Sequence, residues 1–300
     1  MADKIIIALC EGPHDVSFIN RILKTIGFVS NEFKKLKDFP SPMDKLMENE
    51  FTKTDIEQLN LQELRQGILP THTLQKDNIW FFLYSMGGDG KKEPRKTILR
   101  NLKVNVRKIG EIKGDRNSYL NTQLSLIYIF DSDSKGLNRR LAEVLNEVKE
   151  VIPTLNNNIF PANSTFSNVE GIRIGCHIFT GNDNNTGKLE DILMPMLRDT
   201  NEDIFDNAEK YLQTHLNNLR LFSLKLANIN GVISETRSIK GADKLKYDSQ
   251  KSIVGVIGQL QKSGGSNTVC IGQTDYLTLD KISNSSKCND FIDFVKNLII

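Results

Sequence analysis

The sequence lacks several features that would assign it to a familiar class. Its longest apolar runs, Ile5–Cys10 and Ile79–Tyr84, are far shorter than the ~20 residues of a membrane-spanning helix. The first run is also too short for a signal-peptide core, so we expect a cytoplasmic protein without membrane contact. Hydrophobic residues make up 39% of the chain and charged residues 25%, which excludes collagen-like and wholly disordered classes.

Cysteine pairs and nucleotide-binding loops are also missing. The four cysteines, Cys10, Cys176, Cys270 and Cys288, have no CxxC spacing, so we predict small buried hydrophobic residues rather than a zinc site. No GxxxxGK[ST] motif of an ATPase is present. The net charge of +2 does not indicate a partner, and any signal for nucleic acid must come from local clusters.

Strand and helix patterns alternate along the first two thirds of the chain. Apolar runs predict strands at Lys4–Cys10, Asn78–Ser85, Leu124–Phe130 and Gly171–Phe179, the first of them a β-branched run. Helical spacing follows each of them, from Asp15 to Gly27, over about 94–103, over 137–151 and from about 189. Such alternation predicts an α/β fold with a Rossmann-like, mostly parallel sheet flanked by helices.

The pattern also suggests a division of the chain. We expect a core of residues 1–200 interrupted by an insertion at about 29–77, in which 55–66 is a polar amphipathic stretch. Residues 201–300 are predicted to form a mainly helical region packed on the core, with helices over 204–227, 251–260 and 289–298 and a short strand over 267–272.

Acidic residues follow the predicted strands at the edge where an open parallel sheet binds its ligands. Glu11 follows the first strand, Asp131 and Asp133 follow the third, and Glu190 lies just beyond the loop after the fourth. Clustered carboxylates repel one another unless a cation lies among them, and oxygen ligands without His or Cys favour Mg²⁺ or Mn²⁺. The sequence therefore predicts a divalent-metal site.

Each of these acids also has a purely structural interpretation. Asp131 and Asp133 are typical of an Asx-turn and helix cap, and Glu11 could simply end a strand. Glu190 could complement the dipole of a helix from its first turn. Asp15, four residues after Glu11, could join the metal site or cap the first helix. The joint placement of the acids after successive strands favours a site.

Three segments in this order resemble the Toprim domain: Cys10-Glu11-Gly12-Pro13-His14-Asp15, Met86-Gly87-Gly88 and Ile129-Phe130-Asp131-Ser132-Asp133. That domain occurs in topoisomerases, in primases and in nucleases of the overcoming lysogenization defect (OLD) family. The resemblance covers roughly residues 4–27, 78–150 and 171–197. It implies a Toprim-like catalytic core within residues 1–200.

The resemblance also implies roles for individual residues. Glu11, Asp131 and Asp133 would hold Mg²⁺ or Mn²⁺ for metal-assisted phosphodiester hydrolysis. Gly187-Lys188-Leu189-Glu190 resembles the setting of a further glutamate in OLD-like nucleases, which places Glu190 near a second ion. A late lysine is used in those enzymes, and Lys251 is matched to it as the residue that neutralises phosphate charge.

Two features set the chain apart from better-known Toprim proteins. Glu11 and Asp131 are 120 positions apart, a spacing widened by the insertion, and the ATPase motif of full-length OLD proteins is absent. The chain also lacks the large additional domains of topoisomerases and the zinc-binding domain of primases. It is most similar to stand-alone Toprim proteins, some of which are linked to antiphage defence.

A local basic cluster follows the glycine-rich loop at residues 87–90. Between residues 91 and 108, eight Lys and Arg residues stand against Glu93 alone. We expect six of them to contact a phosphate backbone, although an ordinary solvated helix face is the alternative. These six are Lys91, Lys92, Arg95, Lys96, Arg100 and Lys103.

The sequence leaves three functions open. The first is a Mg²⁺-dependent or Mn²⁺-dependent Toprim nuclease acting on DNA or RNA. The second is a non-catalytic Toprim-like module that binds a metal or nucleotide and regulates a protein partner, and the third is a phosphotransfer enzyme for a small molecule. A homodimer or a regulatory protein partner is compatible with each of them.

Overall fold

The computed structural model describes residues 3–52, 69–88, 91–111, 122–156, 158–181, 183–216, 223–238 and 247–300. They form two compact units, which we call unit 1 (Met1–Leu193 and Leu277–Ile300) and unit 2 (Met194–Tyr276). The C-terminal residues thus return to unit 1, which differs from the expected division at residue 200. Among the described helices, none combines the length and apolarity needed to cross a membrane.

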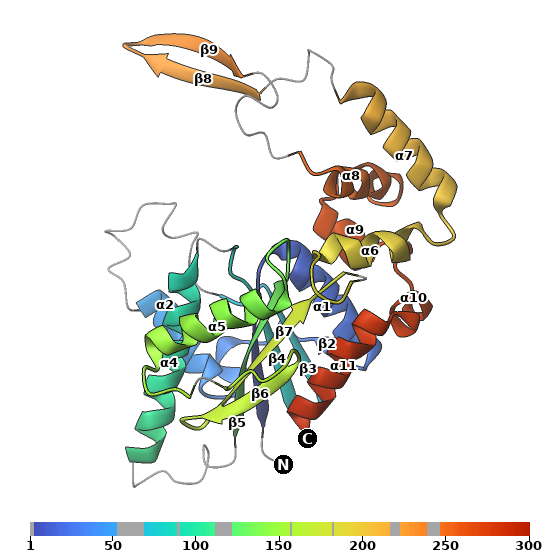
Figure 1. The fold of residues 1–300 in the computed structure, drawn as a ribbon. Helices are drawn as coiled ribbons and strands as arrows, with labels where there is room; N and C mark the ends of the chain where they lie inside the picture. The colour runs from blue at the N-terminus through green and yellow to red at the C-terminus, as the bar shows by residue number, and fades with distance from the viewer. Residues whose placement is uncertain are drawn as a thin grey trace. The chain divides into compact units, whose positions relative to one another are not determined.

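Unit 1 is built around a seven-stranded sheet with the order β2-β3-β4-β1-β5-β7-β6 (Figure 1). The four central strands, β4, β1, β5 and β7, are parallel, and the pairs at both edges are antiparallel. This architecture confirms the predicted α/β class. The strands are β1 (Lys4–Cys10), β2 (Val29–Ser30), β3 (His72–Lys76), β4 (Ile79–Ser85), β5 (Gln123–Asp131), β6 (Thr165–Val169) and β7 (Ile172–Phe179).

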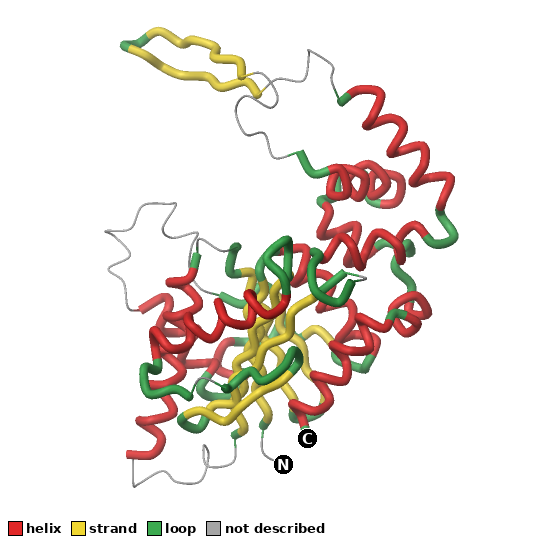
Figure 2. The backbone as a smooth tube through the Cα atoms, viewed as in Figure 1, coloured by secondary structure: helices red, strands yellow, loops and turns green. Residues whose placement is uncertain are grey.

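Helices cover both faces of this sheet, because successive side chains of a buried strand point to opposite faces (Figures 1 and 2). On one face, Ile7 and Leu9 of β1 share a core with residues of α2 (Met43–Thr52), α4 (Lys92–Glu111) and α5 (Leu137–Val151). The other face packs against α1 (Pro13–Thr25) and α11 (Ser286–Ile299). There, the Phe18 ring lies 6.1 Å from that of Phe179.

Part of the expected insertion belongs to the sheet. Residues 72–76 form β3, which pairs antiparallel with β4, and β2 pairs with β3 at the edge. A short 3₁₀ helix, η1 (Leu36–Asp38), precedes α2, and Met43 and Met47 of α2 are buried in the core. The segment is therefore an elaboration of the sheet edge rather than a separate appendage. The amphipathic stretch expected at 55–66 lies outside the described residues.

Two predictions for the C-terminal third are wrong. The helix predicted over 204–227 ends early: α7 spans Glu202–His215, and β8 (Ser223–Ile229) and β9 (Val232–Ser238) form an antiparallel hairpin. Asn230 and Gly231 both have positive φ angles, as a two-residue hairpin turn requires. Residues 267–273 form the helix α9 (Asn267–Gln273) instead of a strand, because so short an apolar run has no decisive period.

The helices predicted over 251–260, over 289–298 and from about 189 are present, and one further helix was not predicted. In unit 2, α8 (Ser249–Gln261) packs between α7 and α9. The helix α6 (Leu189–Arg198) begins in unit 1 and continues into unit 2, and α10 (Leu279–Asn284) precedes α11.

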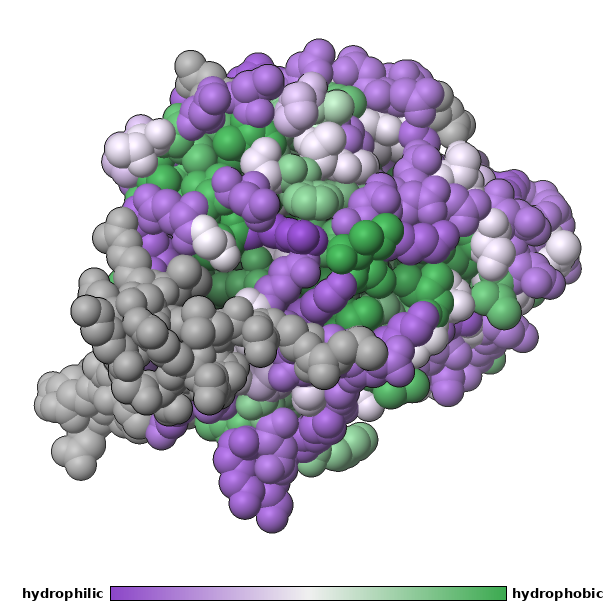
Figure 3. Space-filling view, turned by 90° about the horizontal axis from the view of Figure 1, so that it is seen from below, coloured by the Kyte–Doolittle hydropathy of each residue, from purple (hydrophilic) through white to green (hydrophobic). Residues whose placement is uncertain are grey.

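The surface is mixed in character. Apolar residues lie between hydrophilic ones on the face seen from below (Figure 3). Among the described residues of unit 1, Val29, Phe33 and Leu36 expose large apolar side chains. Single exposed apolar side chains are usual on soluble proteins.

The interior contains the predicted cysteines and one histidine. All four cysteines are buried and free, as expected. His177 on β7 is only 2% exposed, and its ring lies among those of Phe179, Phe291 and Phe294. Its Nδ1 is 2.9 Å from the Ser164 hydroxyl. Burial, with a smaller contribution from the charge of Lys287, lowers the pKa of His177 to about 3.

The shifted pKa of His177 predicts a loss of stability in acid. The unfolded chain protonates this ring below a pKa near 6.5, whereas the folded protein protonates it only near 3. Stability from His177 is therefore lost as pH falls from 6.5. When the pH falls from 6 to 5, the wild type should lose about 1 kcal/mol more unfolding free energy than His177→Phe, which has no ring to protonate at this position. Urea denaturation at both pH values measures it.

The exposed His215 on α7 supplies the control. The difference between wild type and His215→Gln should stay constant over the same range. Parallel stability curves for wild type and His177→Phe would contradict the effect of burial on this ring.

Candidate active site at the carboxyl edge of the sheet

The strand register brings the ends of β1, β4 and β5 to one edge of the sheet. Cys10 at the end of β1 pairs with Ile129 on β5 and with Ser85 on β4. Glu11 therefore emerges beside the last residues of β5 and the start of the loop after β4. That loop approaches Glu11 closely, because a Cβ placed on Gly88 would lie 3.3 Å from Glu11 Oε1. Glu11 and the described start of the glycine loop therefore lie next to each other.

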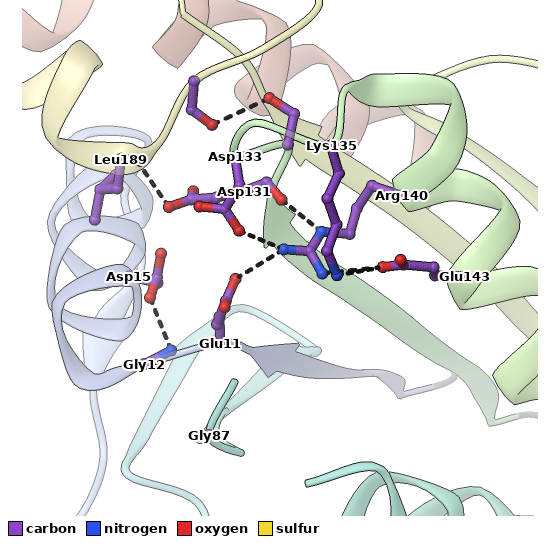
Figure 4. Close-up of polar contacts among 12 residues, drawn as sticks. Glu11, Gly12, Asp15, Gly87, Asp131, Asp133, Lys135, Arg140, Glu143 and Leu189 are labelled. Carbon is purple, nitrogen blue, oxygen red and sulfur yellow. Dashed lines mark hydrogen bonds and ion pairs between the residues drawn. The ribbon is translucent and has the colours of Figure 1, made fainter. Parts of the chain in front are cut away.

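Asp15 caps the first helix and also faces the acidic edge (Figure 4). The helix begins at Pro13, two residues before the predicted cap, and Asp15 Oδ2 accepts a hydrogen bond of 2.8 Å from the Gly12 backbone. Proline is favoured at this first position because its missing N–H has no helical partner. Burial, then the charge of Glu11, raises the pKa of Asp15 to about 7.

Asp131 is the most deeply placed carboxylate of the edge. Its Oδ2 accepts a hydrogen bond of 2.8 Å from the backbone N–H of Leu189, so it caps α6 from a neighbouring strand. Its Oδ1 is buried and has no hydrogen-bond partner within the described ranges. Burial, followed by the charge of Asp15, raises the pKa of Asp131 well above its usual value. Holding a charge here is therefore costly without a cation.

Asp133 bonds a positively charged side chain, that of Arg140, which the sequence did not reveal as part of the site. Its backbone lies in the left-handed region, with a φ of 48°, and it forms a two-way backbone bridge with Gly187. Its Oδ2 accepts a 2.5 Å hydrogen bond from Arg140 on α5. The same guanidinium donates to the Asp131 carbonyl oxygen at 2.7 Å, and its Nη2 lies 4.0 Å from Glu11 Oε2 (Figure 4).

Arg140 joins the two strand ends from a buried position. Its side chain is 3% exposed and also bonds Glu143 on α5 at 3.1 Å. Sequence reasoning missed it because an arginine in a predicted amphipathic helix is typical of a solvated face. The only sequence signal for Arg140 was its position nine residues after Asp131, on the helix that follows the loop of Asp131 and Asp133 (the acidic loop).

Glu190 lies near the cluster in the first turn of α6. It is buried, and its Oε1 is 3.4 Å from His14 Nδ1. Its charge also contributes to the raised pKa of Asp15. The preceding loop needs glycine at 187, because an added Cβ would lie 2.4 Å from the Gly181 nitrogen and φ there is 129°. The structure thus places Glu190 with Asp15 and His14 on one side of the edge.

Lys251 lies elsewhere in the chain. It is an exposed residue of α8 in unit 2, and its backbone N–H bonds the Asp248 side chain that caps this helix. The role matched to Lys251 stays a prediction.

The basic cluster does not form the exposed row expected from the sequence. Arg95 is buried and makes a two-point ion pair with Glu147 on α5, with oxygens at 2.9 and 2.7 Å. Its Nη1 also donates to the Gly87 carbonyl. Lys96 is buried in ion pairs with Glu93 and Glu150. Half of the predicted set therefore carries structural bonds, since Lys103 pairs with Glu170 as well.

Lys91, Lys92 and Arg100 remain exposed. Arg100 forms an ion pair with Glu93, and both side chains are largely in solvent. Lys92 lines a small cavity between α4 and α5, described below.

The donor types at the edge fit a hard divalent cation, but the arrangement fits only in part. Carboxylate oxygens without thiol or imidazole favour Mg²⁺ or Mn²⁺. Asp131 Oδ1, buried and without a hydrogen bond in the described part of the chain, is an available ligand. Even so, the described residues contain no group of three or more His, Cys, Asp or Glu side chains spaced to hold a metal. Asp133 would have to leave Arg140 to complete one.

Comparison with known proteins found no protein family, no curated protein and no solved structure that matches this chain. The Toprim resemblance therefore rests on the motif residues alone.

Substitution of Asp131 should stabilise the metal-free protein. Because the folded pKa is raised, the stability contributed by this group is full below pH 3.8 and is lost as pH rises through the folded value. Asp131→Asn keeps an oxygen for the Leu189 N–H and removes the charge. We expect unfolding free energy in EDTA to rise by about 1–2 kcal/mol at pH 8 and by less at pH 5.

The matched control is Asp290→Asn, at an exposed position of α11. It should change stability little at either pH. A loss of stability in Asp131→Asn at pH 8 would show that the carboxylate is needed as the cap of α6.

Arg95 and Arg100 should differ sharply in their effect on stability. Removing Arg95 leaves the Glu147 carboxylate buried without its ion-pair partner, so Arg95→Gln should cost about 3–5 kcal/mol of unfolding free energy. Arg100→Gln breaks an exposed pair and should cost less than about 1 kcal/mol. Urea denaturation compares them, and equal effects would contradict the structural role of Arg95.

Proposed function

We propose that this chain is a divalent-metal-dependent phosphodiesterase that cleaves DNA or RNA at the carboxyl edge of its sheet. The observation that carries the proposal is the buried Oδ1 of Asp131, which has no hydrogen bond in the described residues. It lies in an acidic cluster where burial and mutual repulsion raise the pKa values of Asp15 and Asp131. A cation would relieve that repulsion.

The surrounding residues would have two roles, holding the cation and binding the phosphate. Glu11 and Asp131 would be the main ligands, with Asp15 and Glu190 beside them and Asp133 joining after release from Arg140. The bound cation would polarise the phosphodiester and the attacking water. Arg140 would then be free to bond the phosphate oxygens, because guanidinium and phosphate match in charge and geometry.

The motif order supports this function over other phosphate chemistry. The Toprim-like segments place Glu11, the glycine loop and the Asp131–Asp133 pair in the chain order expected of phosphodiester enzymes. A parallel α/β sheet with acids at its carboxyl edge is compatible with that chemistry. A role in antiphage defence stays a proposal that rests on the resemblance alone.

Arg140 also favours a second candidate, a non-catalytic module. Its guanidinium bonds Asp133 and lies near Glu11, so the cluster already contains one positive charge. A Toprim-like domain stabilised in this way would bind a nucleotide or metal and regulate a protein partner without hydrolysis.

The experiment is a cleavage assay with Mn²⁺ or Mg²⁺ on plasmid, linear DNA and single-stranded RNA. We expect the wild-type protein to cleave at least one of them, and Glu11→Gln and Asp131→Asn to lose at least roughly a hundredfold in rate, as expected on removal of a metal ligand. Calorimetry should show weaker Mn²⁺ binding in both variants.

Asp290→Asn serves again as the control and should cleave like the wild type. Absence of cleavage together with Mn²⁺ binding that depends on Asp131 would favour the regulatory module. Absence of both would overturn the metal site itself.

A further inference from the structure

A small cavity lies beside the acidic edge, between α4 and α5. Its volume is about 150 Å³, roughly five times the ~30 Å³ that one water occupies in the liquid. Phe130 and Val144 provide its apolar lining. The charged residues around it are Lys92, Arg95, Lys135, Arg140, Glu143 and Glu147.

This lining carries an excess of two positive charges. Arg95 and Glu147 neutralise each other in their buried ion pair. Lys135 and Arg140 both bond the same oxygen, Oε2 of Glu143, at 3.1 Å. Arg140 also bonds the Asp133 carboxylate outside the lining, and Lys92 adds a further cation from α4.

Arg140 connects the cavity with the acidic edge. One side of its guanidinium bonds the carbonyl of Asp131 and the carboxylate of Asp133. Another nitrogen, Nη1, bonds Glu143 at the wall of the cavity. Figure 4 shows Lys135 beside Arg140, on the side of the acidic cluster where α5 begins. Arg140 therefore bonds residues of both the cavity wall and the acidic cluster.

We propose that this cavity binds a phosphate group of the nucleic-acid substrate, next to the phosphodiester that is cleaved. The inference rests on the proposed function for the identity of the substrate. The cavity has room for a tetrahedral phosphate, and Lys92, Lys135 and Arg140 converge on it from α4, the acidic loop and α5. Lysine and arginine are the usual donors to phosphate oxygens.

Glu143 has a defined place in this subsite. Its carboxylate bonds Lys135 and Arg140, so an entering phosphate must compete with it for both cations. Removing the charge of Glu143 should therefore strengthen phosphate binding. A purely structural role for this carboxylate makes no such prediction.

The test is binding of labelled single-stranded oligonucleotides by fluorescence anisotropy in EDTA. Lys135→Gln and Lys92→Gln should each weaken binding about tenfold through loss of a charged hydrogen bond. Glu143→Gln should strengthen it several-fold. Arg139→Gln is the matched control: Arg139 pairs with Glu143 from the same helix but does not line the cavity, and it should change affinity less than about twofold.

Two oligonucleotides, one with a 5′-phosphate and one with a 5′-hydroxyl, distinguish binding of a terminal phosphate from binding of a bridging one. Lys135→Gln will abolish a preference for the first if the cavity takes a terminal phosphate, or weaken both equally if it takes a bridging one. Inorganic phosphate should compete in either case. Equal effects of Lys135→Gln and Arg139→Gln, or weaker binding by Glu143→Gln, would overturn the subsite.

Binding without metal separates this proposal from the nuclease proposal. Loss of affinity in the cavity variants of a protein that does not cleave would retain the subsite and overturn the nuclease. Cleavage by the wild type, together with unchanged affinity in Lys135→Gln, would retain the nuclease and overturn the subsite.

Discussion

The bonds of Arg140 hold together the carboxyl edge of unit 1. A single buried guanidinium bonds the end of β5, the left-handed turn at Asp133 and the first turns of α5 through Glu143. It also lies near Glu11 at the end of β1. Removing one partner from such a buried network leaves uncompensated charges on several elements. The position of the acids relative to one another therefore depends on a cation from a helix.

The same arrangement lowers the electrostatic cost of gathering these acids at one edge. Burial and mutual repulsion oppose ionisation of Asp15 and Asp131, and both pKa values are raised. The protein limits the cost by giving Asp15 the Gly12 N–H and Asp131 the Leu189 N–H. Two helix starts thus stabilise the acids, since unpaired N–H groups at such ends attract negative charge. The structural and the functional interpretations of these carboxylates are compatible.

Much of the fold was predictable because it depends on local patterns. The buried strands of the parallel sheet are apolar runs rich in isoleucine and aromatic residues, and their parallel direction brings the acids that follow them to the carboxyl edge. The wrong predictions concern segments whose apolar pattern is short or whose structure depends on a turn. The hairpin strand β8 begins at Ser223, inside the stretch of helical spacing, and α9 is only seven residues long. Local spacing cannot resolve either case.

The site was predictable only as far as residue type determines position. Glu11 and Asp131 follow strands, so the sheet brings them together. Burial and pairing depend instead on which faces of α4 and α5 meet, as for Arg95, Lys96 and Arg140. Sequence could count their charges but could not tell that Glu147 and Glu150 would pair with the first two.

Pairing across the two helices changes how positive charge is used near the acidic edge. Arg95 and Lys96 fix α4 against α5, and their charge is neutralised by Glu147 and Glu150. Lys92, Lys135 and Arg140 line one small cavity beside the edge, where Glu143 bonds the last two. A surface row of lysines and arginines would attract any polyanion, whereas the proposed subsite would take a single phosphate group. The proposed subsite therefore depends on where the cations are placed rather than on their total number.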